Sequence, residues 1–203
     1  KADNTMRRPH DDILPRRTLF MMFFNPSLRT RNSFEAGIFQ LGGHGHFLEP
    51  SSTRLPTLEG EDLGYASERI SDVARVLSRM GDCIAIRILG DVVGWEYDKS
   101  YRIIEEFAKW SQVPVINMED NKYHPCQGMA DAMALWELFG KNLNGRKIGV
   151  TWTYGSSPKK PIAPHHDFLY MATHASCPSC GRSQVSLFPP ARDAHRSGNR
   201  SAR

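Results

Sequence analysis

Cysteine is scarce in this sequence, and long apolar runs are missing from it. Four cysteines occur among 203 residues, too few and too scattered for the disulfide framework of a small secreted protein. The sequence has no stretch of about 18 apolar residues, so we expect no membrane partner. Residues 1–12 are polar and charged, and they offer no apolar segment of the kind that a signal peptide needs. We therefore expect a cytoplasmic protein.

A charge excess is also missing from most of the chain. The net charge is +4, and five arginines and one aspartate that lie after residue 175 account for all of it. A nucleic-acid surface needs basic side chains gathered on the folded body. We therefore expect no nucleic-acid partner. Binding through the arginine-rich end is a separate hypothesis, which deletion of residues 176–203 would test.

Apolar runs typical of buried strands alternate along the chain with the spacing typical of amphipathic helices. The expected strands are 18–24, 44–49, 83–89, 113–117 and 148–153, and the expected helices are centred on 34–41, 70–77, 103–107, 125–139 and 167–174. Residues 50–64 are polar and rich in turn formers, which predicts a loop. Strands that alternate with helices imply right-handed crossovers. The expected fold class is therefore α/β, with a parallel sheet covered by helices on both faces.

Three regions of different character follow from this pattern. The first four strands and their helices predict one compact domain over residues 1–140, and residues 141–175 resemble the truncated start of a second α/β domain. Residues 176–203 are rich in Ser, Arg, Pro and Gly, which favours a disordered or aberrant tail. The chain starts at Lys1 rather than at a methionine, so we expect a fragment.

Phosphate chemistry is indicated by residues 25–31 (NPSLRTR), where the first expected strand ends and a helix begins. A helix N-terminus gathers backbone N–H groups at the positive end of the helix dipole, so it attracts anions. The hydroxyls of Ser27 and Thr30 add donors, and the guanidinium groups of Arg29 and Arg31 match phosphate oxygens. The alternative is an ordinary capped helix with solvated arginines.

Two further polar groups follow later strands. Arg87 lies inside the apolar run IAIRIL, where a charge is costly unless it is paired. We favour an arginine that faces a ligand over one on a solvent-exposed face of the strand, because both flanking residues are apolar. His124 and Gln127, in the sequence HPCQ, can both donate hydrogen bonds towards one point, for which a polarised carbonyl oxygen is the natural target. The alternative is a histidine that caps a helix beside an ordinary glutamine.

These three groups belong together, because the carboxyl ends of parallel strands meet at one edge of a sheet. Their sequences are FFNPSLRTRNSFEAGIFQLGGH, IAIRI, and VINME followed by HPCQ. They resemble the N-terminal half of the aspartate/ornithine transcarbamylase family, and most closely its acetylornithine and succinylornithine branch. The resemblance covers residues 18–160, and the combination of SxRTR with HPxQ in this order and spacing is highly specific.

The resemblance implies a role for each residue of the three groups. The phosphate of carbamoyl phosphate would be bound by Ser27, Leu28, Arg29, Thr30 and Arg31. The carbamoyl oxygen would be held by the catalytic residues Arg87, His124 and Gln127. Glu119 would lie near the amino substrate, although one more residue separates it from the histidine than in the acetylornithine branch.

The resemblance also implies a reaction. The carbamoyl group of carbamoyl phosphate would pass to the amine of an ornithine-like amino acid with release of phosphate, as in arginine biosynthesis. No metal or organic cofactor is implied, and the expected protein partners are further copies of the chain in a homotrimer with shared active sites. Catalysis would depend on positioning and on charge stabilisation.

Two departures from the family pattern limit this reading. Leu55 stands where the acetylornithine branch has a tryptophan that reaches into the neighbouring subunit's site, so the amine stays open between ornithine, an acylated ornithine and another amino compound. The later motifs of the family's second domain, which supplies most of the amino-acid pocket, are missing. We therefore expect weak binding of carbamoyl phosphate and negligible turnover. The alternative is a truncated, non-catalytic relative that binds carbamoyl phosphate or another anion.

Cysteine and histidine supply two weaker signals. His174, Cys177 and Cys180 have the spacing HxxCxxC, but zinc prefers four ligands and a fourth is not evident nearby, so we expect no metal site. Cys126 and His124 stand on either side of a proline and need not face each other, so a cysteine nucleophile is not favoured.

Overall fold

The computed structural model describes residues 10–49, 53–61, 64, 67–141, 143, 146–151, 162–174 and 184–188. The chain divides into two compact units. The first comprises residues 1–126 and 161–166, and the second comprises residues 127–160 and 167–203. The polar groups expected after the first, third and fourth strands all lie in the first unit, apart from Gln127.

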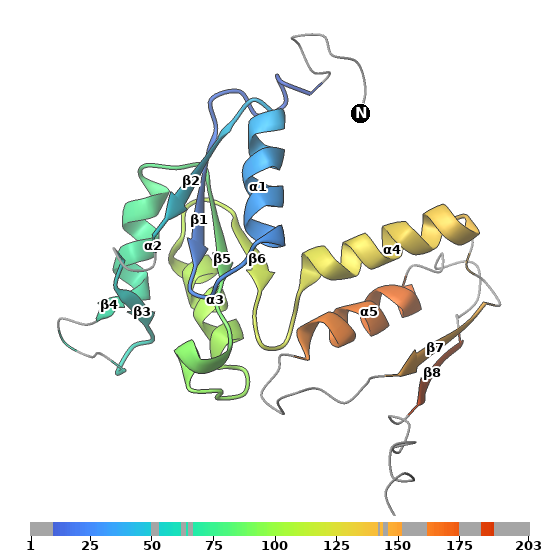
Figure 1. Cartoon of the computed structure of the whole chain (residues 1–203). Coiled ribbons are helices and arrows are strands. Elements are labelled where there is room, and N and C mark those ends of the chain that lie inside the picture. Colours follow the sequence, from blue (N-terminus) through green and yellow to red (C-terminus); the bar gives the residue numbers. More distant parts are fainter. Residues whose placement is uncertain are drawn as a thin grey trace, which may run out of the picture. The chain divides into compact units, whose positions relative to one another are not determined.

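The core of the first unit is a sheet of four parallel strands (Figure 1). In spatial order the strands are β2 (His44–Leu48), β1 (Thr18–Phe23), β5 (Cys83–Arg87) and β6 (Val115–Glu119). Leu19 to Phe23 of β1 and Ile84 to Ile86 of β5 are buried. Strands buried on both faces have continuous apolar sequences, which is why these two are the clearest in the sequence. The expected α/β fold with a parallel sheet is confirmed.

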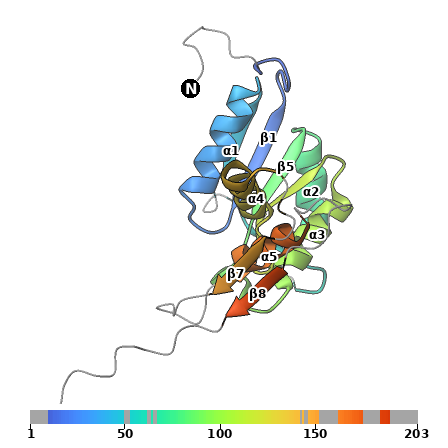
Figure 2. The ribbon, with the colours of Figure 1, turned by 90° about the vertical axis from the view of Figure 1, so that its right-hand side faces the viewer.

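Helices cover both faces of this sheet, and Figure 2 shows α1 and α2 on opposite sides of β1 and β5. Helix α1 (Arg29–Gln40) packs Ile38 in the same cluster as Leu19, Met21 and Phe23. Helices α2 (Ile70–Ser78) and α3 (Lys99–Trp110) pack on the other face, in the cluster that contains Phe20 and Met22. Successive strand residues point to opposite faces, so β1 divides its side chains between the two clusters.

Two expectations about individual elements were wrong. Residues 50–64, expected as a loop, contain strand β3 (Leu55–Thr57), which pairs in parallel with β4 (Ser67–Arg69). Strands of three residues show too little periodicity to be read from sequence, and the proline in β3 argues against a strand. The strand expected at 113–117 begins two residues later, as β6. The N–H of Val113 bonds to the Ser111 side chain, and Pro114 has no N–H and contributes only its carbonyl, which accepts the Ile84 N–H, so the register of paired residues starts at Val115.

The second unit contains most of two helices and two strands. These are α4 (Pro125–Phe139), β7 (Lys147–Thr151), α5 (Ala163–His174) and β8 (Gln184–Phe188). Strands β7 and β8 pair in parallel. Within this unit α4 and α5 approach closely at Gly128, where a Cβ atom would lie 2.9 Å from that of Asp167. Strand β8 lies in the segment 176–203, whose other residues are outside the described part. No helix among the described residues is long and apolar enough to cross a membrane.

Candidate functional site

The carboxyl ends of β1 and β5 flank the point where the sheet reverses its direction of growth. From β1 the chain passes to β2 on one side, and it later returns to β5 on the other side of β1. Open α/β sheets bind ligands in the crevice at such a switch point. The segments that follow β1, β5 and β6, here called the carboxyl rim, carry the polar groups singled out from the sequence.

The first group of the carboxyl rim forms the turn into α1. The helix begins at Arg29 with Leu28 as its N-cap, and a leucine side chain offers no acceptor to the N–H groups of the first turn. Arg29 is exposed, and Ser27 and Thr30 are half-buried. A helix start without a side-chain cap favours an anion at this place over the alternative of an ordinary capped helix.

Arg31 is held more tightly than Arg29. Its guanidinium lies over the ring of Phe47 in β2, 3.7 Å from the ring centroid, and its Nε atom lies 3.8 Å from the Glu35 carboxylate. Cation–π contact and charge attraction both keep this side chain along β2. A phosphate at the start of α1 would therefore compete with these two contacts for Arg31, whereas Arg29 is exposed to solvent.

Arg87 ends β5 and connects the first group to β6. Its Nη1 atom donates to the backbone carbonyls of Asn25 and Pro26, at 3.3 and 3.1 Å, just ahead of Ser27. Its Nε and Nη2 atoms lie 2.8 and 2.6 Å from Oε2 of Glu119. Only 14% of the Arg87 side chain is exposed. Arg87 is therefore a buried, paired arginine at the switch point and not a solvated one.

A β-bulge brings Glu119 opposite Arg87. Ile86 pairs with Asn117, but the next residue of β5 pairs with Glu119, so β6 carries one extra residue at this point. Bulges re-aim side chains and are frequent beside active sites. Glu119 Oε2 also lies 3.6 Å from Nε2 of His124, whose side chain is 13% exposed. One buried carboxylate therefore joins the arginine of β5 to the histidine that follows β6.

Gln127 belongs to the second unit. Its side-chain amide donates to Oδ1 of Asp131, one helical turn further along α4, at 2.9 Å. In the first unit, by contrast, Arg87, Glu119 and His124 share direct contacts. The turn into α1 joins this group through the Pro26 carbonyl.

Asn25 belongs to the segment NPSLRTR, but the sequence predicted no role for its side chain. Its Oδ1 atom accepts the Leu89 N–H and its Nδ2 atom donates to the Leu89 carbonyl, both at 2.9 Å. This two-point contact fixes the turn after β1 to the segment after β5. Asparagine before proline is an ordinary turn sequence, so no local signal distinguishes a clamp of this kind from a turn former.

The cysteine and metal hypotheses gain no support. Burial raises the pKa of the half-buried Cys126 thiol, whereas a nucleophilic cysteine needs a lowered pKa. No group of His, Cys, Asp and Glu in the described part of the chain could hold a metal ion. Cys177, Cys180 and the side chain of His174 lie outside that part.

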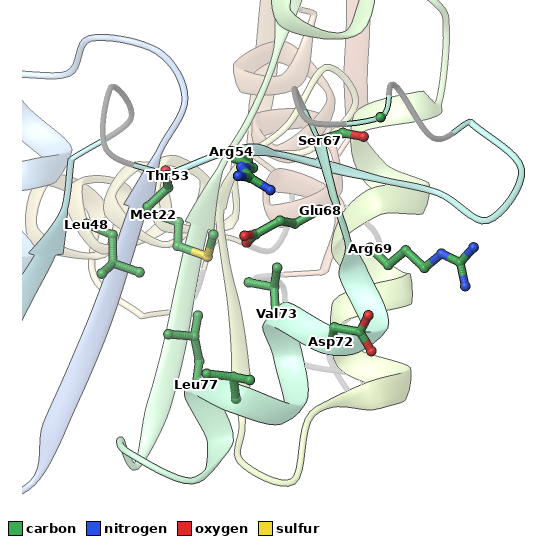
Figure 3. A pocket seen from close by; sticks show the side chains of 12 residues that line it. Met22, Leu48, Thr53, Arg54, Ser67, Glu68, Arg69, Asp72, Val73 and Leu77 are labelled. Atoms are coloured by element: carbon green, nitrogen blue, oxygen red, sulfur yellow. The ribbon is translucent and has the colours of Figure 1, made fainter.

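A separate cavity of about 770 Å³ lies beside β2 and α2, next to the β3–β4 pair (Figure 3). Met22, Leu48 and Val73 form its apolar wall, and Arg54 and Glu68 line its polar side. None of the described residues of the carboxyl rim is among those that line it. The cavity therefore belongs to the outer edge of the sheet and not to the switch point.

Fold and rim together define an open α/β domain with charged and polar side chains at the switch point of its parallel sheet. Residues 1–137 match the family model described as "Aspartate/ornithine carbamoyltransferase, carbamoyl-P binding domain". This match covers more than half of the chain, and the chain therefore belongs to the aspartate/ornithine carbamoyltransferase family.

Named relatives extend this assignment. An N-acetylornithine carbamoyltransferase of Xanthomonas axonopodis pv. citri (strain 306) is 46% identical over 146 residues, which are 70% of this chain and 42% of the relative. An ornithine carbamoyltransferase of Cupriavidus metallidurans is 46% identical over 188 residues, which are 88% of this chain and 55% of the relative. The chain spans about half the length of these relatives.

A solved structure gives the same picture. A mutant N-acetyl-L-ornithine transcarbamylase, crystallised with carbamyl phosphate and N-succinyl-L-norvaline, is 41% identical to this chain with a TM-score of 0.77. The match covers 88% of this chain and 53% of that one. The fold of the chain is therefore that of about half of a transcarbamylase.

Proposed function

We propose that the chain binds carbamoyl phosphate at its carboxyl rim. We further propose that it represents the first half of a carbamoyltransferase that acts on the amine of an ornithine-like amino acid. The observation that carries the proposal is the Arg87 guanidinium, which reaches both the turn before Ser27 and the Glu119 carboxylate beside His124. A ligand with a phosphate at the start of α1 and a carbonyl near Arg87 would span these groups. Membership of the family supports this choice of ligand.

Each rim residue takes a role in this proposal. The phosphate is bound by the start of α1 and its side chains, namely Ser27, the Leu28 backbone, Arg29, Thr30 and Arg31. The carbamoyl oxygen is held by Arg87, His124 and Gln127. Glu119 lies beside the incoming amine. The complete enzyme is proposed to act as a homotrimer with shared sites.

The proposed reaction is a carbamoyl transfer to nitrogen. The amine nitrogen attacks the carbonyl carbon, the bond between that carbon and the phosphate oxygen breaks, and the proton that the amine loses passes to the departing phosphate. Hydrogen-bond donors at the carbonyl oxygen stabilise the negative charge of the tetrahedral intermediate. The positive end of α1 and the nearby arginines stabilise the departing phosphate. These groups need no cofactor for that chemistry.

Calorimetric titration with a stable phosphonate analogue of carbamoyl phosphate tests the binding step. Arg29→Ala is expected to weaken binding at least tenfold, because a hydrogen bond to a charged group contributes about 1.5–3 kcal/mol. Arg102→Ala is the matched control, since Arg102 is a half-exposed arginine on α3 that forms an ion pair with Glu96, and it is expected to leave the affinity unchanged. Equal affinities of the wild type and Arg29→Ala would overturn the site assignment.

A non-catalytic relative that binds carbamoyl phosphate or another anion is the second candidate. It is favoured by the fact that Nε, Nη1 and Nη2 of Arg87 all have partners within the protein. The two candidates separate in an assay of the complete protein, of which this chain is proposed to be the first half, with carbamoyl phosphate and a panel of ornithine, N-acetylornithine and N-succinylornithine. Formation of a ureido product supports the enzyme, and binding without product supports the second candidate.

A further inference from the structure

The segment between β6 and α4 contains a completely buried carboxylate, that of Asp120. Its Oδ1 atom accepts the backbone N–H groups of Lys122 and Tyr123, at 2.5 and 2.9 Å. Its Oδ2 atom accepts the side-chain amide of Asn117 at 2.5 Å. The Asp120 N–H in turn donates to the Tyr123 carbonyl at 2.9 Å. One aspartate therefore closes a turn that ends directly before His124.

Burial of the Asp120 carboxylate costs free energy because it removes the hydration of the charge. A buried charge is tolerated only when hydrogen bonds replace its water, and here backbone and amide donors do so. An aspartate that accepts backbone N–H groups two and three residues ahead forms a local turn in place of regular structure. The turn sets the direction in which the chain leaves β6, and therefore the place where the His124 side chain starts.

The outer side of the same turn is also tied down. The Asn121 N–H donates to Oγ of buried Ser100 in α3, at 2.9 Å. Oδ1 of Asn121 accepts the N–H of Gly90 at 2.8 Å. Lys122 forms an ion pair with Asp98 at 3.1 Å. Because the outer contacts fix the turn to its neighbours, loss of the inner carboxylate is expected to alter the turn locally and not to release it.

We propose that Asp120 is a positioning residue that holds His124 in register with Glu119 and the carboxyl rim. The proposal rests on the proposed function, in which His124 holds the carbamoyl oxygen. Asp120 itself does not contact the ligand. It acts only through the turn that it closes. Its loss therefore weakens binding of the carbamoyl group and leaves binding of the phosphate at the start of α1 unchanged.

A comparison of two ligands on the full chain tests this division. Inorganic phosphate engages the start of α1 alone, whereas the phosphonate analogue also engages His124. Asp120→Asn removes the negative charge that the two backbone N–H groups and the Asn117 amide share, and it requires the Asn117 amide to turn its Oδ1 atom towards the new side chain. It is expected to weaken the analogue about tenfold or more, since small misplacements of an orienting group are costly. Phosphate affinity is expected to stay unchanged. An equal loss for both ligands would indicate a merely structural role and overturn the proposal.

A double-mutant cycle asks whether the effect passes through His124. If it does, Asp120→Asn combined with His124→Gln weakens the analogue no more than His124→Gln alone does. Additive losses would show that Asp120 acts by another route. Asp98→Asn is the matched control, because it changes an acid on the outer side of the same turn. Its backbone has a φ of 69°, which asparagine tolerates. It is expected to leave both affinities unchanged.

The ring signals of His124 in NMR spectra give a readout that needs no ligand. They can be assigned among the eight histidines by comparison with His124→Gln. Asp120→Asn is expected to shift them, whereas unchanged ring signals in a folded variant would sink the proposal. If the wild type binds neither ligand, the proposed function fails and this spectrum still decides the role of Asp120. If Asp120→Asn does not fold, Asn117→Ala, which removes one of the three donors, is expected to cause the same shift in smaller measure.

Discussion

The Glu119 carboxylate lies where a ligand of Arg87 would bind. It takes two nitrogens of the guanidinium while its own side chain is only 7% exposed. Under the proposed function the carbamoyl oxygen needs the same guanidinium, and a carboxylate close by repels the phosphate group of the ligand. Glu119 therefore holds Arg87 in place, and under the proposed function we expect it also to compete with the ligand for Arg87, in addition to the role near the amino substrate that the family resemblance implies.

These two effects can be separated by substitution. Glu119→Gln keeps the shape and removes the charge, so we expect it to tighten binding of the phosphonate analogue about fivefold, for a competing charge worth about 1 kcal/mol. Glu119→Ala leaves a buried guanidinium without its acid, and we expect it to lower the free energy of unfolding by about 3 kcal/mol. Calorimetry and urea denaturation measure the two quantities.

Glu96→Gln, an exposed acid on the surface, serves as the control and should change neither quantity. A weaker affinity in Glu119→Gln would contradict the competition, because it would mean that the charge assists the ligand. An unchanged free energy of unfolding in Glu119→Ala would mean that water replaces the lost partner of Arg87.

At the scale of elements, one side chain ties the start of β1 to the start of β5. Asp82 accepts the Thr18 N–H at 2.9 Å and a hydrogen bond from Arg17 at 2.5 Å. The hydrogen bond from Thr18 first, and then that from Arg17, lowers the pKa of the Asp82 carboxyl below its ordinary value of 3.8. A carboxyl whose pKa is lower in the folded state adds stability above the unfolded pKa. That stability is lost as pH falls through the folded pKa.

Asp82→Asn is therefore expected to destabilise the protein at neutral pH. It is also expected to make the loss of stability at acidic pH less steep. The difference in urea midpoint between wild type and variant should be full at pH 6 and should shrink as pH falls below 3.8. Glu59→Gln, at an exposed turn, is the control and should follow the wild type at every pH. A difference that is equally large at pH 6 and well below the folded pKa would show that Asp82 acts through shape alone.

The same scale separates what the sequence predicts from what it does not. Strands β1 and β5 are buried on both faces, so continuous apolar runs in the sequence predict them. The parallel sheet is predicted by the alternation of strands with helices. The bulge at Arg87 depends on one extra residue in a partner strand, a relation between distant segments that no local pattern records. Asp120 looks like an ordinary turn residue in sequence, and only its complete burial reveals what it holds. The motifs thus gave the candidate residues, and pairing between strands decides which of them meet.

At the scale of the whole molecule, ligand binding and turnover should be separable. The turn into α1, Arg87, Glu119 and His124 all belong to the first unit, and only Gln127 lies in the second. The chain spans about half the length of its named relatives. In the family that the sequence resembles, the later half supplies most of the amino-acid pocket. Carbamoyl phosphate should therefore bind to this chain, whereas transfer to an amine should be negligible.

Thermal unfolding with and without ligand tests this separation. A ligand at about a hundred times its Kd adds about 2.7 kcal/mol to the folded state. For a chain of this size each kcal/mol raises the midpoint by about 2–4 °C, so the phosphonate analogue should raise it by about 5–10 °C. Arg29→Ala at the same ligand concentration should show about half of this rise or less, because a tenfold weaker affinity leaves about 1.4 kcal/mol of stabilisation. The same preparation, given carbamoyl phosphate and ornithine or N-acetylornithine, should form no detectable ureido product. An unfolding midpoint of the wild type that does not change with ligand would contradict binding. Steady product formation would contradict the expectation that transfer needs the later half of a transcarbamylase.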